Sequence, residues 1–390
     1  MDFAPKSFSQ REVIATIRAF VECESPSDDA VSVNHFVDLL AETVKDIARV
    51  RTYPGGTVGS KVYGKHLRCE FLLPSQKKQG QILALGHSDT VWPLGTLRTM
   101  PFRQSQGRLW GPGVFDMKAG LAFFIFAMRA LRERDVPVAR RVILQVNSDE
   151  EIGSPASRAL TEEAARVSSA VLVLEPGQGL EGKLKTARKG VGDYTVKVRG
   201  RAAHAGVDFA SGASAIVEMS RQIQKIAGFT RLDRGITVSP GVIHGGTRSN
   251  VIAAECTAEI DVRIPKASDA RYLERQFASL RAFDKRCTVE VTGGINRPPL
   301  ERSAGVRALF RKAKALAAEL GVQLEESSTG GGSDGNFTAA LGVPTLDGLG
   351  AVGEGAHASH ESILIDRMVD RIALLSKLVA ALGNGVIARR

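Results

Sequence analysis

The chain alternates short apolar runs with helix-like segments, and this alternation restricts the fold more than any other feature of the sequence. Apolar runs occur at residues 81–87 (QILALGH), 141–147 (RVILQVN) and 170–176 (AVLVLEP). Helical periodicity separates them at 118–133 and 157–167. Strands joined through helices pair in parallel, and helices cover both faces of such a sheet. The sequence therefore predicts an α/β domain whose ligand site lies beyond the carboxyl ends of the strands.

The pattern changes between residues 185 and 296. Four strands with alternating polar and apolar residues are predicted there, at 192–200, 235–246, 256–264 and 287–293. Two helices are predicted between them, at 213–228 and 269–283. This set describes an inserted α+β module with a ferredoxin-like arrangement.

The remaining chain forms the predicted main domain, which is discontinuous and consists of residues 1–184 and 297–390. Its last part contains a helix at 302–319, a short strand within 343–350 and a closing helix at 364–382. The length of 390 residues exceeds the usual size of a single core, which agrees with two domains.

Composition argues against several other classes of protein. Apolar residues make up 43% of the chain and charged residues 24%, as in ordinary globular proteins. The longest apolar run, residues 119–128, is too short to span a bilayer, and the amino terminus lacks the apolar segment of a signal peptide. We therefore expect a cytoplasmic protein with no membrane partner. The four scattered cysteines do not form a disulfide or thiolate-metal pattern.

The formal net charge of +10 is compatible with two kinds of partner, nucleic acid or a small acidic substrate. The lysines and arginines are spread along the chain, without the clustered stripe that is typical of nucleic-acid binding. We therefore expect no nucleic-acid partner.

Three consecutive acids, Asp149, Glu150 and Glu151, follow the run at 141–147. A solvated turn tolerates such a cluster, so the acids alone do not indicate a site. Residues able to bind metal also lie at the ends of other predicted elements, at His87, Asp89, Asp116, Glu175 and His357. Each has an ordinary explanation when taken singly: Asp116, for example, could cap a helix.

Taken together, these residues are expected to meet at one edge of the sheet. Two histidines with several carboxylates form a nitrogen and oxygen ligand set that suits zinc, or its neighbours cobalt and manganese. One bridging carboxylate, with a histidine and an acid for each ion, would hold two metals about 3.5–4 Å apart. Paired cations would neutralise the crowded acids.

Several motifs resemble the M20 family of dinuclear zinc peptidases: HSDTV (87–91), GPGVFDMKAG (111–120), DEEIGS (149–154), GRAAHAG (200–206) and GEGAH (353–357). HSDTVWPLGTL and TGGGSDGNF (329–337) are most similar to the glutamate carboxypeptidases, the carboxypeptidase G2-like enzymes. The resemblance runs from about residue 10 to the carboxyl terminus. It implies a catalytic domain with a lid and dimerisation domain inserted into it, and a homodimer that forms through the lid.

The resemblance also implies a ligand set for two zinc ions per chain. Asp116 would bridge the ions, with His87 and Glu175 on one and Glu151 and His357 on the other. His360 is a rival to His357, which we prefer because Glu361 follows it at the family spacing.

Catalytic roles follow from the same resemblance. Glu150 would be the general base. Asp89, two residues beyond His87, would hold the His87 ring through its carboxylate. His204 would reach the active site of the partner subunit and stabilise the oxyanion, and Asn250 would be a second polar group at that place.

Substrate contacts are expected from positively charged side chains and from a glycine-rich turn. Arg263 would bind the free carboxylate of the substrate, and Lys183 and Arg297 would supply further positive charge. The backbone around Gly331, from Gly330 to Gly332, would line the same pocket.

The expected activity is hydrolysis of an amide bond that releases a carboxyl-terminal amino acid, preferably glutamate, from an N-acyl or peptidyl substrate. The alternatives within the family are a deacylase of the acetylornithine or succinyl-diaminopimelate type and a dipeptidase. An alternative of another class is a basic binding protein that has lost catalysis.

Overall fold

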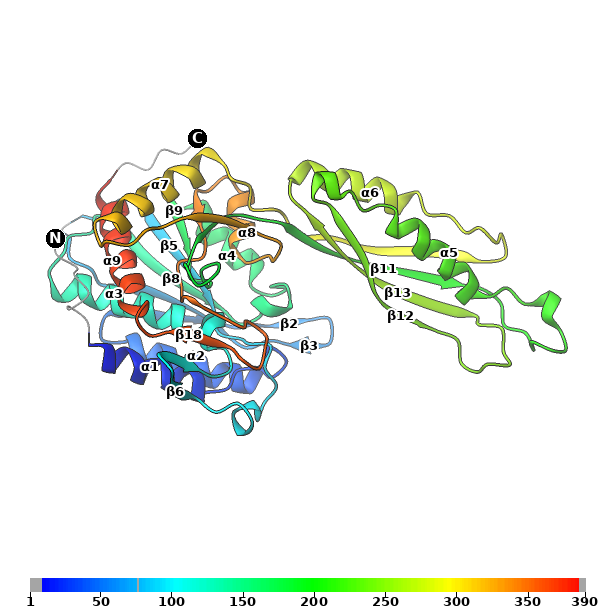
Figure 1. Ribbon diagram of the computed structural model, residues 1–390, viewed down its shortest axis with the longest axis horizontal. Helices are drawn as coiled ribbons and strands as arrows, with labels where there is room; N and C mark the ends of the chain where they lie inside the picture. The colour runs from blue at the N-terminus through cyan, green and yellow to red at the C-terminus, as the bar shows by residue number, and fades with distance from the viewer. Residues whose placement is uncertain (1–8, 76, 386–390) are drawn as a thin grey trace. The chain divides into compact units, whose positions relative to one another are not determined.

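The computed structural model describes residues 9–75 and 77–385 of the chain. The chain divides into two compact units (Figure 1). Unit 1 consists of Met1–Ala187, Arg302–Ser328 and Ser333–Arg390, and unit 2 consists of Arg188–Glu301 and Thr329–Gly332.

The unit boundaries lie a few residues beyond the predicted positions 184 and 297. The segment Thr329–Gly332 groups with unit 2, although the sequence analysis placed it in the main domain. The predicted domain ends at residues 1 and 390 fall outside the described residues.

A six-stranded sheet forms the centre of unit 1. Its strand order is β1 (Ala48–Tyr53), β4 (His66–Phe71), β8 (Arg141–Asn147), β5 (Gln81–His87), β9 (Ala170–Val173) and β16 (Thr345–Leu346). β5 is parallel to both neighbours and pairs with β8 along its whole length, from Gln81↔Arg141 to His87↔Asn147. β16 is also parallel to β9, whereas β1 and β4 form an antiparallel edge. The predicted mostly parallel sheet is confirmed, with an added edge that the sequence analysis did not identify.

Helices cover both faces of this sheet (Figure 1). The helices of unit 1 are α1 (Gln10–Glu22), α2 (Ala30–Val44), α3 (Ala119–Glu133), α4 (Arg158–Arg166), α7 (Ala304–Ala318), α8 (Gly335–Ala340) and α9 (Met368–Asn384). The larger core lies under α1, α2, α3, α7 and α9, and a smaller core lies on the face of α4. α3 is buried along most of its length, as expected for the apolar run at 119–128.

Short strands complete unit 1. β17 (Gly353–Glu354), β18 (Ser362–Leu364), β7 (Arg108–Trp110) and β6 (Arg103–Ser105) form a small sheet in that order. Two-stranded ladders are formed by β2 (Thr57–Val58) with β3 (Lys61–Val62), and by β10 (Leu184–Arg188) with β15 (Glu326–Thr329).

Unit 2 is an antiparallel sheet with two helices. The strand order is β12 (Thr237–Gly245), β13 (Glu255–Ile264), β11 (Gly190–Arg199) and β14 (Thr288–Arg297), and the helices are α5 (Ala215–Ala227) and α6 (Ala270–Ala278). The Tyr194 ring of β11 stacks on Phe277 of α6 with a centroid separation of 3.8 Å.

The helix predicted at 269–283 ends earlier, at Ala278. The buried carboxylate of Glu218 on α5 accepts hydrogen bonds from the backbone N–H groups of Phe283 (2.9 Å) and Asp284 (3.0 Å). These bonds hold Phe283 and Asp284 against α5, so this segment does not continue helix α6.

Within the described chain, none of the helices has the length and apolar character that a membrane crossing requires. Cys23, Cys69, Cys256 and Cys287 are free thiols.

Candidate metal centre

The parallel strands bring the predicted metal-binding residues to one edge of the unit 1 sheet. His87 is the last residue of β5, Glu150 and Glu151 follow β8, and Glu175 follows β9. His87, Glu150 and Glu175 each offer a ligand atom within 4.8 Å of the others, and so do His87, Asp116 and Glu151. Residues that lie far apart in the sequence therefore form one cluster.

Asp116 lies at the centre of this cluster and faces a different histidine with each carboxylate oxygen. Its Oδ1 is 3.3 Å from His87 Nε2, and its Oδ2 is 3.4 Å from His357 Nε2. His87 Nε2 also lies 3.5 Å from Glu175 Oε1, and His357 Nε2 lies 3.3 Å from Glu151 Oε2. The cluster thus has two halves that share the Asp116 carboxylate.

These separations fit atoms that share a metal ion. Two ligand atoms at about 2.1 Å from one tetrahedral zinc ion are about 3.4 Å apart, which is longer than a well-formed hydrogen bond. The four histidine–carboxylate separations lie between 3.3 and 3.5 Å. Glu151 Oε1 is also buried and has no hydrogen-bond partner in the described part of the chain. The donors present therefore suit a divalent metal in each half.

The carboxylates of the cluster favour positive charge on the groups beside them. Burial by itself disfavours an imidazolium at His87, yet hydrogen bonds to Asp116 and Glu175 raise its pKa well above the usual value. Asp116 and Glu151 raise the pKa of His357 to about 10. Burial and the neighbouring Asp116 charge raise the pKa of Glu151 to about 7. Divalent cations would supply this positive charge in place of the histidine protons.

Glu361 organises the loop that carries Asp116. Its buried carboxylate accepts backbone N–H groups from Gly113 (2.8 Å), Phe115 (2.8 Å) and Asp116 (3.0 Å), and the indole N–H of Trp92 (2.7 Å). The sequence analysis used Glu361 only to choose between two histidines. In the sequence, its structural role was indicated by its negative charge within a segment of mostly small and polar residues.

Asp89 also holds a loop, in a way that differs from the prediction. Its carboxylate oxygens accept the backbone N–H groups of Glu150 and Glu151, both at 3.1 Å, and the hydroxyl of Ser27 at 2.8 Å. The His87 ring contacts the backbone carbonyl of Asp89 at 2.8 Å, whereas the nearest carboxylate oxygen is 3.6 Å from Nδ1. The expected contact to the ring therefore comes mainly from the backbone, and the side chain positions the two acids.

Glu150 is buried and lines a small cavity with His87, Glu175 and Asp334. Asp334 lies in the TGGGSDGNF motif, but the sequence analysis assigned no role to it. Its carboxylate accepts hydrogen bonds from Asn147 Nδ2 at 2.5 Å and from the Ser154 hydroxyl. These contacts fix a second acid beside the predicted base.

His357 lies in a turn with a positive backbone angle, φ 62°, which is uncommon for a residue other than glycine. Strain of this kind is frequent at functional sites. His360, the rival ligand, is exposed, as is His357. His357 is distinguished by its contacts with Asp116 at 3.4 Å and Glu151 at 3.3 Å.

His204 and Asn250 lie on adjacent exposed loops of unit 2. His204 forms a β-bridge with Val251, and the Ala205 N–H donates to the Asn250 carbonyl at 3.0 Å. His204 Nδ1 accepts the N–H groups of Gly206 (3.2 Å) and Val207 (3.1 Å). A neutral ring therefore carries its proton on Nε2, where it is a hydrogen-bond donor.

The predicted substrate contacts are divided between the two units. The Arg263 guanidinium is paired with Asp261 through Nε and Nη2, with the closest contact at 2.6 Å. Lys183 belongs to unit 1 and pairs with Glu325 at 2.9 Å.

Arg297 and the glycine-rich turn do meet, within unit 2. Gly332 packs closely against the Arg297 side chain, and Arg188 donates to the carbonyls of Gly331 (3.1 Å) and Gly332 (3.0 Å). The sequence analysis did not identify Arg188, whose only signal was its place in the basic segment KTARKG.

Comparisons with known proteins agree with this geometry. Residues 83–381 match the model of peptidase family M20/M25/M40. Carboxypeptidase G2 of Pseudomonas sp. (strain RS-16) is 29% identical over 98% of this chain and 92% of that protein. A succinyl-diaminopimelate desuccinylase of Cereibacter sphaeroides (strain ATCC 17025) is 28% identical over 75% of this chain and 81% of that protein.

Solved structures show the same fold. Aminopeptidase PepT of Bacillus cereus superposes with a TM-score of 0.79 at 23% identity, covering 95% of this chain and 98% of PepT. The YXEP protein of Bacillus subtilis, described as a dinuclear metal-binding peptidase, has a TM-score of 0.67 at 15% identity, covering 95% and 96%. Because the family match spans most of the sequence, this chain is a member of peptidase family M20/M25/M40.

Proposed function

We propose that this hydrolase uses two divalent metal ions to cleave an amide bond and release a carboxyl-terminal amino acid, with a preference for glutamate. The observation that carries the proposal is the position of Asp116, whose two oxygens face His87 and His357 separately. A carboxylate placed in this way suits a bridge between two ions.

His87 and Glu175 would hold one ion with Asp116, and Glu151 and His357 would hold the other. Zinc is the metal we propose, because the ligands are imidazoles and carboxylates at separations that suit tetrahedral coordination. When bound, such ions acidify water and polarise the substrate carbonyl.

Glu150 is proposed as the general base. It is buried at the same edge and adjoins Glu151, a proposed metal ligand, and its backbone N–H is fixed by Asp89 at 3.1 Å. A carboxylate at this position can take a proton from the attacking water and give it to the leaving amine. A positioned acid–base group contributes about 10²- to 10⁴-fold to the rate.

His204 of the partner subunit is proposed to stabilise the oxyanion. The ring presents Nε2 as a donor, which is the group that such a role requires. Asn250 on the adjacent loop would contribute a second polar group.

The preference for glutamate rests on similarity and on charge. Carboxypeptidase G2 matches nearly the full length of the chain. Arg297, at the end of β14 beside Gly332, would provide positive charge for an acidic side chain.

A substrate panel tests this proposal. The metal-loaded protein is assayed against N-acyl derivatives of glutamate, aspartate, alanine and lysine, together with N-succinyl-diaminopimelate and simple dipeptides. We expect the highest kcat/KM for release of glutamate. Preferred cleavage of the succinyl compound or of dipeptides would replace the glutamate assignment with the corresponding family activity.

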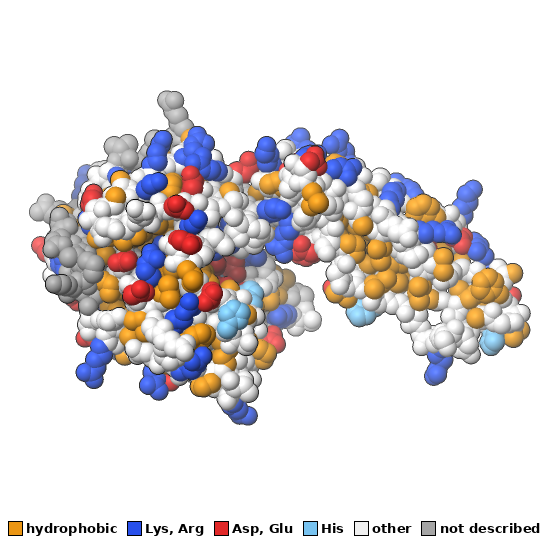
Figure 2. All heavy atoms as spheres, in the orientation of Figure 1, with side chains coloured by type: hydrophobic (Ala, Val, Ile, Leu, Met, Phe, Trp, Pro, Cys, Tyr) orange, Lys and Arg blue, Asp and Glu red, His pale blue; other side chains and the backbone are white. Residues whose placement is uncertain are grey.

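We also propose a homodimer formed through unit 2. β12 is an edge strand with exposed Val242 and Ile243, and α5 exposes Ile216 and Val217. Figure 2 shows hydrophobic side chains gathered on the surface of unit 2. An unpaired edge with apolar side chains suits pairing with a second copy. Light scattering should give the mass of two chains, and Ile243→Lys should shift the protein toward monomer. A monomeric parent protein would contradict the dimer.

A further inference from the structure

A second hollow lies in unit 1 along the β1–β4 edge of the sheet, beside α4. It has a volume of about 420 Å³ and is bounded by β1, β4, α4 and the first residues of β5 and β8, Gln81 and Arg141. None of its lining residues belongs to the metal cluster. The hollow is therefore separate from the proposed catalytic site.

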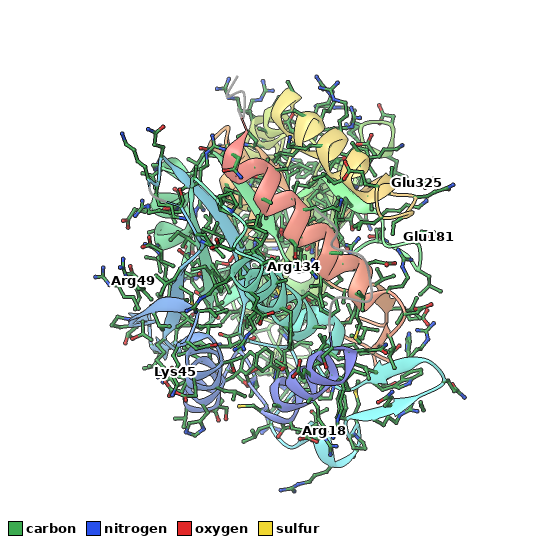
Figure 3. All side chains as sticks on the ribbon, turned by 90° about the vertical axis from the view of Figure 1, so that its left-hand side faces the viewer. Arg18, Lys45, Arg49, Arg134, Glu181 and Glu325 are labelled. Carbon is green, nitrogen blue, oxygen red and sulfur yellow. The ribbon has the colours of Figure 1, made fainter. Side chains whose placement is uncertain are left out.

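Four arginines line this hollow: Arg49, Arg51, Arg68 and Arg141. In the residues that the structure describes, none of the four forms an ion pair with a carboxylate. The two acids in the lining are Glu70 and Glu163, so the formal charge of the lining is positive. Figure 3 shows Arg49 at the outer edge of unit 1, with its side chain directed away from the sheet.

Two of these arginines face each other across the strands. Arg51 and Arg68 are direct partners in the antiparallel β1–β4 pair. Like charges at such positions destabilise a sheet. The Tyr53 ring lies near both guanidiniums, with its centroid 4.7 Å from Arg51 Cζ and 4.9 Å from Arg68 Cζ. This contact offsets part of the repulsion, but neither guanidinium forms an ion pair with a carboxylate in the described chain.

Arg68 is held in place before any ligand binds. Its Nη1 donates to the Tyr53 hydroxyl at 3.3 Å, and its Nη2 donates to Gln145 Oε1 at 2.8 Å and to the Leu160 carbonyl at 3.3 Å. The Nε of Arg68 is buried and has no hydrogen-bond partner in the described chain. A buried donor without an acceptor is costly, and a fixed guanidinium loses little entropy on binding.

We propose that this hollow binds a small polyvalent oxyanion. Guanidinium groups match the oxygens of phosphate and carboxylate groups, and the volume suits a small molecule. The anion would neutralise the Arg51–Arg68 pair. The site is independent of the proposed hydrolysis, because none of its residues belongs to the metal cluster.

Isothermal titration calorimetry at constant ionic strength tests the site with two weak metal chelators, inorganic phosphate and tricarballylate. The double variant Arg49→Gln/Arg51→Gln is compared with the parent and with Arg311→Gln/Lys312→Gln, which loses two exposed charges from α7. We expect one anion per chain in the parent and the control, and binding at least about tenfold weaker in the arginine variant, as expected for lost charge-assisted hydrogen bonds.

The calorimetry either identifies the class of anion that binds or shows that the hollow is not a binding site. Binding of phosphate alone would indicate a phosphoryl ligand, and binding of tricarballylate alone would indicate a polycarboxylate. Equal affinity in all three proteins, or no heat beyond that of added sodium chloride, would overturn the proposal. Because binding is measured without turnover, failure of the hydrolase assignment does not affect the result.

Discussion

Asp116 Oδ1 lies 3.3 Å from His87 Nε2, while the second oxygen of the same carboxylate lies 3.4 Å from the Nε2 of His357. One side chain therefore connects two halves of the cluster. Burial alone would raise the pKa of Asp116, but hydrogen bonds from His357 and His87 hold it well below the usual value. The carboxylate is thus ionised and available to bind cations across the neutral pH range.

Asp116→Asn tests the bridge. Asparagine keeps the shape but offers one oxygen, so it cannot serve both halves as an anion. We expect metal content to fall from about two ions per chain to at most one, with turnover reduced by at least about 100-fold. Elemental analysis and steady-state kinetics measure both effects. Asp46→Asn, an exposed control in unit 1, should keep both metals. Two metals in Asp116→Asn would contradict the bridging role.

Glu361→Gln tests how the Asp116 loop is held. Each Glu361 oxygen accepts two N–H donors, so either orientation of a glutamine amide places an N–H against other donors. We expect a loss of about 1–3 kcal/mol in the free energy of unfolding, the range for a buried polar group without a partner. Urea denaturation of metal-free protein measures the loss. The control Glu354→Gln removes only a half-exposed ion pair with Arg108 and should change stability by at most about 1 kcal/mol.

The pair Glu326–Arg302 predicts a specific dependence of stability on pH. Hydrogen bonds from Arg302 lower the pKa of Glu326 to about 2, although burial acts in the opposite direction. Glutamate in the unfolded chain has a pKa of about 4.3. Because the pKa of Glu326 is lower in the folded state, the pair stabilises the fold at pH values above about 4.3, and this contribution is lost as the pH falls toward about 2.

Both side chains of this pair are partly exposed, so the contribution is expected to be about 1 kcal/mol. The stability difference between the parent and Glu326→Gln should therefore be full at pH 6–7 and should shrink between about pH 4.5 and 2. Urea denaturation at each pH measures it. A difference that stays constant over this range would show that the ion pair does not act in this way.

The strand ends were predictable because apolar runs mark buried strands, and parallel strands end at one edge. His87 is the last residue of β5, Glu175 lies two residues beyond β9, and Glu150 and Glu151 follow shortly after β8. His357 and Asp116 lie in loops, where no periodicity indicates position. Their residue types suggested that they join the cluster, and the motif resemblance assigned their individual roles.

Contacts between distant segments could not be predicted from spacing. Glu361 binds N–H groups about 245 positions earlier in the chain, and Asp334 binds Asn147, which lies 187 positions away. Asp89 illustrates a related difficulty: the i, i+2 relationship placed it near the His87 ring, but the backbone N–H groups of Glu150 and Glu151 take its carboxylate. The antiparallel β1–β4 edge was also missed. β1 is exposed and rich in arginine, whereas Leu67, Cys69 and Phe71 of β4 alternate with polar residues, a strand pattern that the sequence analysis did not use.

Glu150→Gln provides the most direct test of the proposed mechanism, through metal content and turnover measured on the same preparation. The account predicts about two metal ions per chain, as in the parent, with turnover lower by about 10²- to 10⁴-fold because the general base is lost. Parent-like turnover in Glu150→Gln, or fewer than one bound metal ion per chain in the parent protein, would contradict it.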